Sequence, residues 1–334
     1  MTKHTSTRMA ASAAFALCAL TAAPASAQMV PVGAGPAYGG PFNPRAEGYA
    51  ASIGAEFAQY RAALAVRRGR LSFGSTIATQ DNTDLTGQDS GGWQGLNSAW
   101  ASLDVKQYNG TYSGESASLI FGADILAGNT LIGVIGGYNT STVTIPTAQR
   151  IEAEGFSIGP YFATQLTDSL SLDGFIAFGE PDYDIDNGVF SGEKVFGNIT
   201  LTGSVEMDRL ELTPFISLAS AREKLPAFSS AIPFPVVAYP ATTIKGVVAT
   251  IGTGINYEPF ERGGLLYLPR AGIEVDAVRN DDGFGNIADF TTLRLSGGYT
   301  ILGDNGGWSL GGDVARTSEG TTTVGASASY FWQF

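Results

Sequence analysis

The chain has 334 residues, with 44 glycines, 44% hydrophobic residues and a formal net charge of −12 at pH 7. An acidic protein repels the phosphates of nucleic acid, so this charge balance excludes DNA and RNA as expected partners. The whole chain holds one histidine and one cysteine, which limits the chemistry available to any active site.

Residues 1–27 have the parts of a secretory signal peptide. Lys3 and Arg8 give a positive start, residues 9–23 are nearly all small or apolar, and "PASA" before Gln28 ends as a cleavage site does. We expect this segment to be removed on export, with periplasmic chaperones as transient partners. The mature chain then has 334 − 27 = 307 residues, and the loss of two positive charges gives −12 − 2 = −14.

Two further regions precede the main pattern. Residues 28–46 are rich in proline and glycine, which predicts a linker. Residues 47–92 hold one helical pattern, to about Leu71, followed by a polar loop. Four arginines gather near the end of this helix, where they suit the helix dipole and could also plug a lumen lined by acids. They are Arg61, Arg67, Arg68 and Arg70.

From Trp93 to Phe334 the hydrophobic pattern has period two, which is typical of half-buried strands. In "SASLIFGADILA", for example, Leu119 and Phe121 share one face while Ser118 and Asp124 share the other. We predict twelve strands, at about 97–108, 115–127, 130–142, 151–166, 169–181, 193–207, 209–223, 242–258, 264–279, 287–301, 306–317 and 320–334.

Alternation alone fits a soluble β-sandwich as well as a membrane barrel. Three features favour an all-β transmembrane antiparallel β-barrel of about 12 strands over residues 93–334. Short and long connections alternate along the chain, the strand count is even, and acids within strands lie opposite the apolar face. A sandwich core would not bury these acids without partners, whereas a polar lumen accepts them. The expected lumen acids are Asp104, Asp124, Asp173, Glu274, Asp276 and Asp313.

The chain ends in "SYFWQF", and its alternate aromatics fall on the apolar face. We expect this strand to close the barrel and its aromatics to belong to the interfacial girdle beside outer-membrane lipid. Tyr330, Trp332 and Phe334 also form the expected signal for the barrel assembly machinery of the outer membrane.

The order of these features resembles the autotransporter β-domain. The likeness rests on the helix ending "ALAVRRGRL", on "LNSAWASLDVKQYNGTYSGESASLIFGADILAGNTLIGVIGGY" and on the terminal "YFWQF", and it covers roughly residues 47–334. In that family a twelve-stranded barrel encloses a helix, which implies an outer-membrane location and the helix of this chain inside its lumen. The family also carries a passenger domain upstream of the barrel. Only residues 28–46 separate the predicted leader from the helix, so we expect no sizeable passenger.

Catalysis and metal binding are not expected. His4 and Cys18 leave with the leader, which excludes Ser-His and Cys-His catalysis and zinc bound by His or Cys. Glu274 and Asp276 share a face, but solvation in a lumen explains the pair better than glycoside hydrolysis. Residues 280–286, "NDDGFGN", lack the spacing and the closing Glu of a calcium loop. We therefore predict no enzyme, no cofactor and no metal.

Two kinds of function follow from the sequence. One is an autotransporter-like barrel with a structural, translocator-like or surface-interaction role, and the other is a passive diffusion pore. Adhesion is a third possibility, because the loop over residues 224–243 is apolar and rich in proline. The same loop could instead fold inward as a constriction.

Overall fold

The computed structural model describes residues 98–110, 112–145, 149–185, 188–230, 237–281, 283, 287–303 and 306–333. The predicted signal peptide, linker and arginine-rich helix, together with Phe334, lie outside these residues. No helix in the described part of the chain is long and apolar enough to cross a membrane.

In the described part of the chain one sheet of 15 strands forms the barrel, and three of its strands are short, which leaves 15 − 3 = 12 long strands. The long strands are β1 (Ser98–Asn109), β2 (Ser113–Ala127), β3 (Thr130–Ile145), β4 (Gln149–Thr167), β5 (Leu170–Ile185), β7 (Glu193–Gly203), β9 (Leu210–Leu225), β12 (Thr242–Tyr257), β14 (Leu265–Asp281), β15 (Ile287–Gly303), β16 (Gly306–Thr317) and β17 (Thr322–Gln333). The short ones are β6 (Gly188–Ser191), β8 (Val205–Met207) and β13 (Phe260–Arg262). A separate two-stranded sheet joins β10 (Phe228–Ser230) to β11 (Val237–Tyr239).

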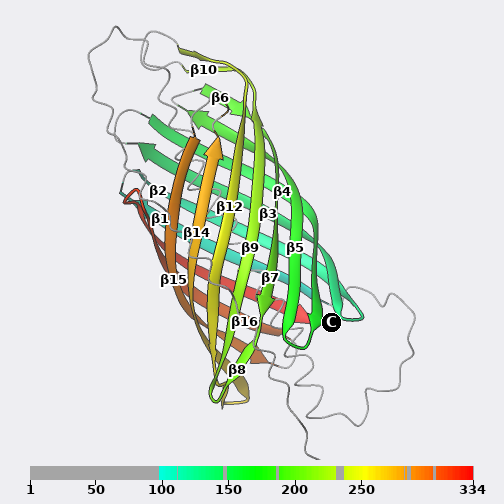
Figure 1. The fold of residues 1–334 in the computed structure, drawn as a ribbon. Helices are drawn as coiled ribbons and strands as arrows, with labels where there is room; N and C mark the ends of the chain where they lie inside the picture. Colours follow the sequence, from blue (N-terminus) through cyan, green and yellow to red (C-terminus); the bar gives the residue numbers. More distant parts are fainter. Residues whose placement is uncertain are drawn as a thin grey trace, which may run out of the picture. The chain divides into compact units, whose positions relative to one another are not determined.

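The sheet closes on itself as an antiparallel barrel (Figure 1). Closure is made by β1 and β17, whose register runs from Ser98 opposite Gln333 to Asn109 opposite Thr322. Pairing of β9 with β12 completes the ring. A closed barrel has no unpaired edge within the sheet, so every long strand satisfies its backbone on both sides. The predicted twelve-stranded membrane barrel, with the last strand closing it, is confirmed.

Strand ends differ from the prediction mainly on the side of the long connections. β5 continues to Ile185, four residues past its predicted end, although Asp182 and Asp184 read as loop residues. Its pairing with β4 and β6 continues there, so the backbone remains in the sheet. The predicted strand at 193–207 is divided into β7 and β8 at Ser204, whose N–H donates to the carbonyl of Ser169 at 2.9 Å.

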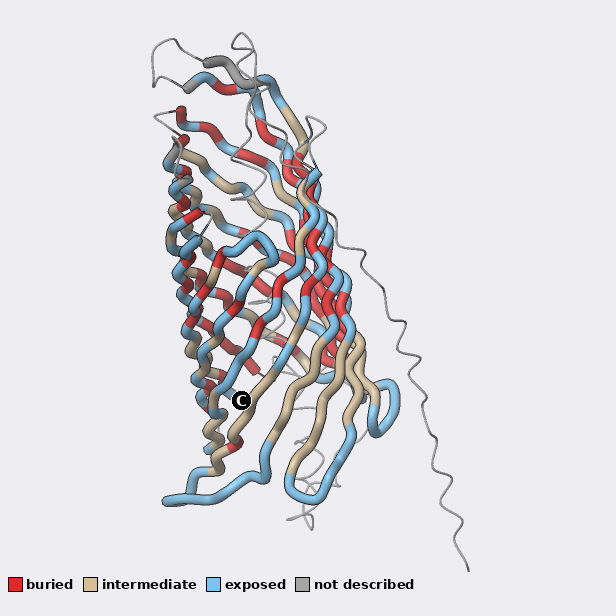
Figure 2. Tube along the Cα trace, turned by 60° about the vertical axis from the view of Figure 1, so that its left-hand side comes forward, coloured by how far each residue is buried: buried red, intermediate tan, exposed pale blue. Residues whose placement is uncertain are grey.

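Exposed and buried residues alternate along much of the long strands (Figure 2). The outward face carries apolar side chains such as Leu119 and Phe121, which in a membrane meet lipid. The inward face carries the buried polar and charged side chains together with buried apolar ones such as Ile120 and Phe196. Near the short turns an aromatic group is formed by Trp308, Tyr330 and Trp332. The ring centroid of Tyr330 lies 4.5 Å from that of Trp308 and 4.3 Å from that of Trp332. This group lies where an interfacial girdle belongs.

At the end with the longer connections, the outward face changes from apolar to charged. On β5 the exposed Phe178 is followed by Glu180 and Asp182 on the same face. On β9 the exposed Leu218 is followed by Arg222 and Lys224. The strands therefore extend beyond the apolar band, and β6 and β10 lie at this end while β8 lies at the other (Figure 1). Longer loops face the exterior in barrels of this kind.

Candidate functional site in the barrel lumen

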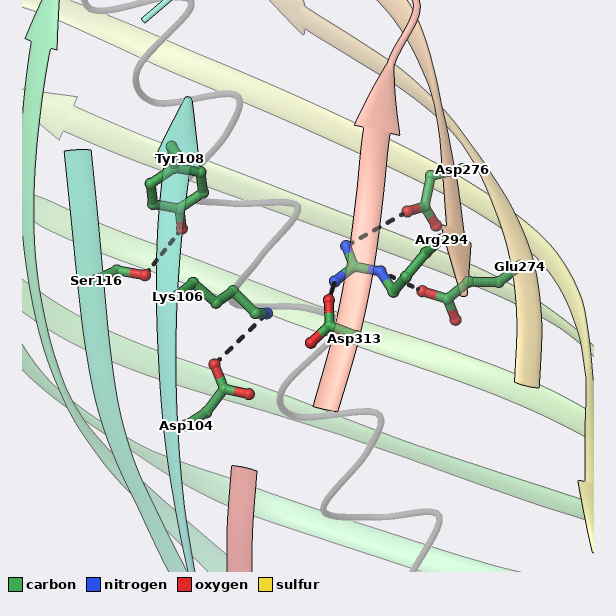
Figure 3. A network of polar contacts seen from close by, with 8 residues as sticks. All are labelled: Asp104, Lys106, Tyr108, Ser116, Glu274, Asp276, Arg294 and Asp313. Carbon is green, nitrogen blue, oxygen red and sulfur yellow. Dashed lines mark hydrogen bonds and ion pairs between the residues drawn. The ribbon is translucent and has the colours of Figure 1, made fainter. Parts of the chain in front are cut away.

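The lumen face contains a guanidinium surrounded by three acids. Arg294 on β15 lies directly opposite Glu274 of β14, and its Nε is 2.8 Å from Glu274 Oε1. Its Nη1 donates to Asp313 Oδ2 of β16 at 3.0 Å, and its Nη2 is 3.9 Å from Asp276 Oδ2. Thr250 of β12 donates to the other oxygen of Asp276 at 2.6 Å. The Arg294 side chain is 9% exposed, so these carboxylates supply its compensating charge (Figure 3).

A second ion pair lies beside it on β1. Lys106 Nζ is 3.6 Å from Asp104 Oδ1, and the Lys106 side chain is 1% exposed. Above them Tyr108 and Ser116 share a hydrogen bond of 2.8 Å between their hydroxyls (Figure 3).

Gly325 of β17 joins these two groups in one row. It lies opposite Lys106 on one side and opposite Asp313 on the other. A Cβ at Gly325 would lie 2.4 Å from Asp313 Oδ1 and 3.3 Å from Lys106 Cγ, so the missing side chain makes room for both charged groups. The result is a continuous row of charges, which we call the lumen belt: Asp104, Lys106, Asp313, Arg294, Glu274 and Asp276. The belt crosses the seam between β1 and β17.

Another acid, Asp124 of β2, accepts hydrogen bonds from two hydroxyl groups. The hydroxyls of Ser98 and Tyr161 each donate to one of its carboxylate oxygens. Trp100 Nε1 donates to the Tyr161 oxygen at 2.9 Å, and the two rings meet edge to face with centroids 6.1 Å apart. A Cβ on Gly122 would lie 2.7 Å from the Trp100 ring, so this glycine provides the space that the indole occupies.

Further acids lie on the lumen face. Asp173 of β5 is fully buried opposite Thr200 of β7. Glu211 of β9 accepts hydrogen bonds from Ser204 and, at 3.0 Å, from Asn256 Nδ2. Glu223, also on β9, accepts a hydrogen bond from Tyr183.

The structure places all six acids of the sequence prediction on the lumen face. Four of them, Asp104, Glu274, Asp276 and Asp313, are gathered with Lys106 and Arg294 near the seam. Sequence reasoning missed Lys106, Arg294, Glu211, Glu223 and Tyr161 as lumen residues with a part in these networks. Strand parity was the available signal, since each has the parity of a neighbouring lumen acid or polar residue. Tyr330 and Trp332 face outward on the closing strand, as the period-two pattern requires. The described residues contain no group of three or more His, Cys, Asp or Glu arranged to hold a metal.

Comparison with known proteins agrees with this architecture. The family model of the autotransporter β-domain matches residues 92–275, more than half of the chain, and the chain therefore belongs to this family. This membership places the barrel in the outer membrane. No curated protein matches the sequence significantly.

Two solved structures share the fold. The β-domain of the Bordetella autotransporter BrkA matches with a TM-score of 0.61 and 15% identity, over 72% of this chain and 100% of its own. The translocator domain of the autotransporter NalP from Neisseria meningitidis matches with a TM-score of 0.55 and 17% identity, over 82% of this chain and 98% of its own. At these identities the likeness concerns the fold.

Proposed function

We propose that this protein is a translocator-type barrel whose lumen holds a positively charged segment of polypeptide, and that it is not an enzyme. The observation that carries the proposal is the acidic lining of a barrel of this size. The width of the cavity in such a barrel and the negative charge of its lining both suit a cationic helix.

The size argument follows from the strand number. Twelve strands spaced about 4.8 Å apart and tilted by about 40° give a backbone-to-backbone diameter of about 24 Å. Lining side chains of about 6 Å on each side leave a width of about 12 Å, which is the width of one α-helix. Eight strands would be filled by their own side chains, and 16 to 18 would leave an open channel.

The charge argument rests on Glu211 of the lumen face. It receives its hydrogen bonds from Ser204 and Asn256, which are neutral. Neutral donors stabilise a carboxylate without removing its charge, so the lumen keeps an acidic character that attracts cations. The arginine-rich helix predicted over residues 47–71 is the segment of this chain with the matching charge.

Planar-bilayer conductance tests the proposal. Replacement of Arg61, Arg67, Arg68 and Arg70 by serine removes the charges that would hold the segment, so conductance should rise from small, unstable steps to larger, steadier ones. A matched control replaces four exposed arginines of the described strands and should leave conductance unchanged. They are Arg150, Arg262, Arg279 and Arg316. Equal conductance in the first variant and the wild type contradicts the proposal and favours a passive diffusion pore.

The loop between β9 and β12 bears on the adhesin alternative. Phe228 of β10 stacks on Phe190 of β6 with centroids 4.3 Å apart, and Phe190 stacks on Tyr183 of β5 at 5.2 Å. Phe228 is buried by this contact. An apolar side chain used within the barrel rim is not available to a partner, so the packing supports an internal role for this part of the loop.

Assembly is the remaining part of the proposed function. The outward Tyr330 and Trp332, with the terminal Phe334, supply the pattern that the outer-membrane assembly machinery would recognise on the closing strand. Deletion of Phe334 should sharply reduce the amount of heat-modifiable barrel in the membrane. Normal accumulation of the truncated barrel would exclude the terminal residue as the signal.

A further inference from the structure

A charged groove opens at the long-loop rim of the barrel and is not used by the lumen networks. It has a volume of about 1080 Å³ and crosses the ends of β5, β7, β9, β12 and β14. Its charged lining residues are Glu180, Glu193, Lys224, Lys245 and Asp281.

Two cations lie close together at the edge of this groove: Lys245, which lines it, and Arg222 on the wall beside it. Lys245 of β12 lies directly opposite Arg222 of β9 on one side and Asp281 of β14 on the other, and the side chains of Arg222 and Lys245 are exposed. Like charges directly opposite each other on a sheet are destabilising. Neither forms an ion pair with a described residue, whereas the adjacent Lys224 has its Nζ 3.1 Å from Glu193 Oε2. An anion between Arg222 and Lys245 would relieve their repulsion.

The height of the groove identifies the kind of anion. On the same strands the outward face becomes apolar and exposed toward the middle of the barrel, at Val247 next to Lys245, at Phe178 next to Glu180, and at Leu218 beyond Ser220. The outward face thus changes from lipid-facing to charged at the level of Arg222 and Lys245. A lipid beside this wall would have its headgroup at that level.

A neighbouring sector of the same rim places acids directly opposite acids. Glu152 lies opposite Asp184, and Glu154 lies opposite Asp182, on the outward face of β4 and β5. This acidic sector repels phosphate. Anionic headgroups are therefore favoured beside Arg222 and Lys245 over this acidic sector.

We propose that the groove binds the phosphorylated sugar headgroup of an anionic glycolipid in the outer leaflet. Arg222 and Lys245 take a phosphate through charge-assisted hydrogen bonds, and Glu180 and Asp281 accept hydrogen bonds from sugar hydroxyls. The lipid tails lie along the apolar face below, on Leu218 and Val247. The inference is independent of whether the lumen translocates or conducts anything.

Lipid retention by the purified full-length barrel tests this site. The protein is reconstituted in phosphatidylcholine vesicles that contain lipopolysaccharide with its phosphates intact or removed, and the lipid that stays bound after detergent extraction is measured by native mass spectrometry. The wild type should retain the phosphorylated form only. The R222Q/K245Q variant should retain about 10- to 30-fold less lipid. It loses two cations, and each Lys or Arg near an anionic membrane surface adds a similar increment to the binding free energy.

R316Q is the matched control, because Arg316 on β16 is also exposed and lies at the same end of the barrel, away from the groove. It should retain lipid as the wild type does, and equal losses in R316Q and R222Q/K245Q would overturn the site. Competition by inorganic phosphate as effective as that by free lipopolysaccharide would assign the groove to a soluble anion and overturn the lipid. Heat-modifiable migration verifies folding, and K245Q alone, with its exposed side chain, replaces the double variant if that does not fold.

Discussion

Two arginine–glutamate contacts in this barrel have almost the same length and very different surroundings. Arg294 Nε lies 2.8 Å from Glu274 Oε1 in the lumen, with side chains 9% and 17% exposed. Arg150 Nη2 lies 2.7 Å from Glu152 Oε1 on the outer rim, with side chains 65% and 49% exposed. Distance alone would rank them as equal, so burial and the number of partners must separate their contributions to stability.

The surroundings differ in both respects. Arg294 has contacts with three acids on the two neighbouring strands, so its removal leaves several carboxylates without their cation in a poorly solvated place. Arg150 and Glu152 are two residues apart on one strand, and water replaces either partner at little cost. The same chemical pair is therefore a structural element in the lumen and a surface detail at the rim.

Arg294→Met should have the largest effect. The substitution keeps most of the volume and leaves Glu274, Asp276 and Asp313 without the guanidinium, which we expect to cost about 3–5 kcal/mol of unfolding free energy. Urea unfolding of the barrel in detergent, followed by heat-modifiable migration, measures the loss. Adding Glu274→Gln and Asp313→Asn to this variant should recover part of the stability, because the uncompensated charge is then removed. Wild-type stability of Arg294→Met would show that the lumen solvates the three acids fully.

The inward position of these acids could be predicted from the sequence because strand parity is a local property. The placement of Asp276 opposite the apolar face needed only its neighbours Val275 and Ala277. The partner of an acid depends on the register of separate strands, and a shift of one residue would bring a different side chain opposite Glu274. The parity of Arg294 indicates an inward residue, yet its contacts follow from β14–β15 and β15–β16 pairing, which alternation does not determine.

Two tyrosine–carboxylate hydrogen bonds extend the comparison. Tyr161 donates to the buried Asp124, and Tyr138 donates to the exposed Glu154 at 2.9 Å. Tyr161→Phe removes a hydrogen bond to a buried charged group and leaves Trp100 Nε1 without its acceptor, so we expect a loss of about 1.5–3 kcal/mol. Tyr138→Phe is the control and should change the unfolding midpoint little, since water replaces the hydroxyl. Equal midpoints for both variants would contradict the difference in burial.

Gly325→Ala tests whether the lumen belt depends on space at the seam. The new methyl group would meet Asp313 Oδ1 at 2.4 Å, and the flexible carboxylate would move away from Arg294 to admit it. A loss of about 1–2 kcal/mol in the same urea experiment is expected, which is within the range for overpacking. Gly297→Ala is the control, because a Cβ added there has room. Its nearest atom, apart from those of the chain neighbours, is the carbonyl oxygen of Arg270 at 3.8 Å. A loss in the control as large as in Gly325→Ala would assign the effect to the strand backbone.

The smallest effect is expected from Arg150→Ala, despite the shorter contact that it removes. An exposed ion pair gains little Coulomb energy in water and loses side-chain entropy when it forms, so the cost should be less than about 1 kcal/mol. Added salt screens such pairs, and the small difference between wild type and variant should shrink further in 1 M NaCl, where the screening length is about 3 Å. The effect of Arg294→Met should persist in that salt, because buried charges are screened much less. Parallel urea titrations of both variants at low and high salt compare the two pairs directly. A salt-independent loss for Arg150→Ala as large as that for Arg294→Met would mean that contact distance, and not burial, sets the energy of ion pairs in this barrel.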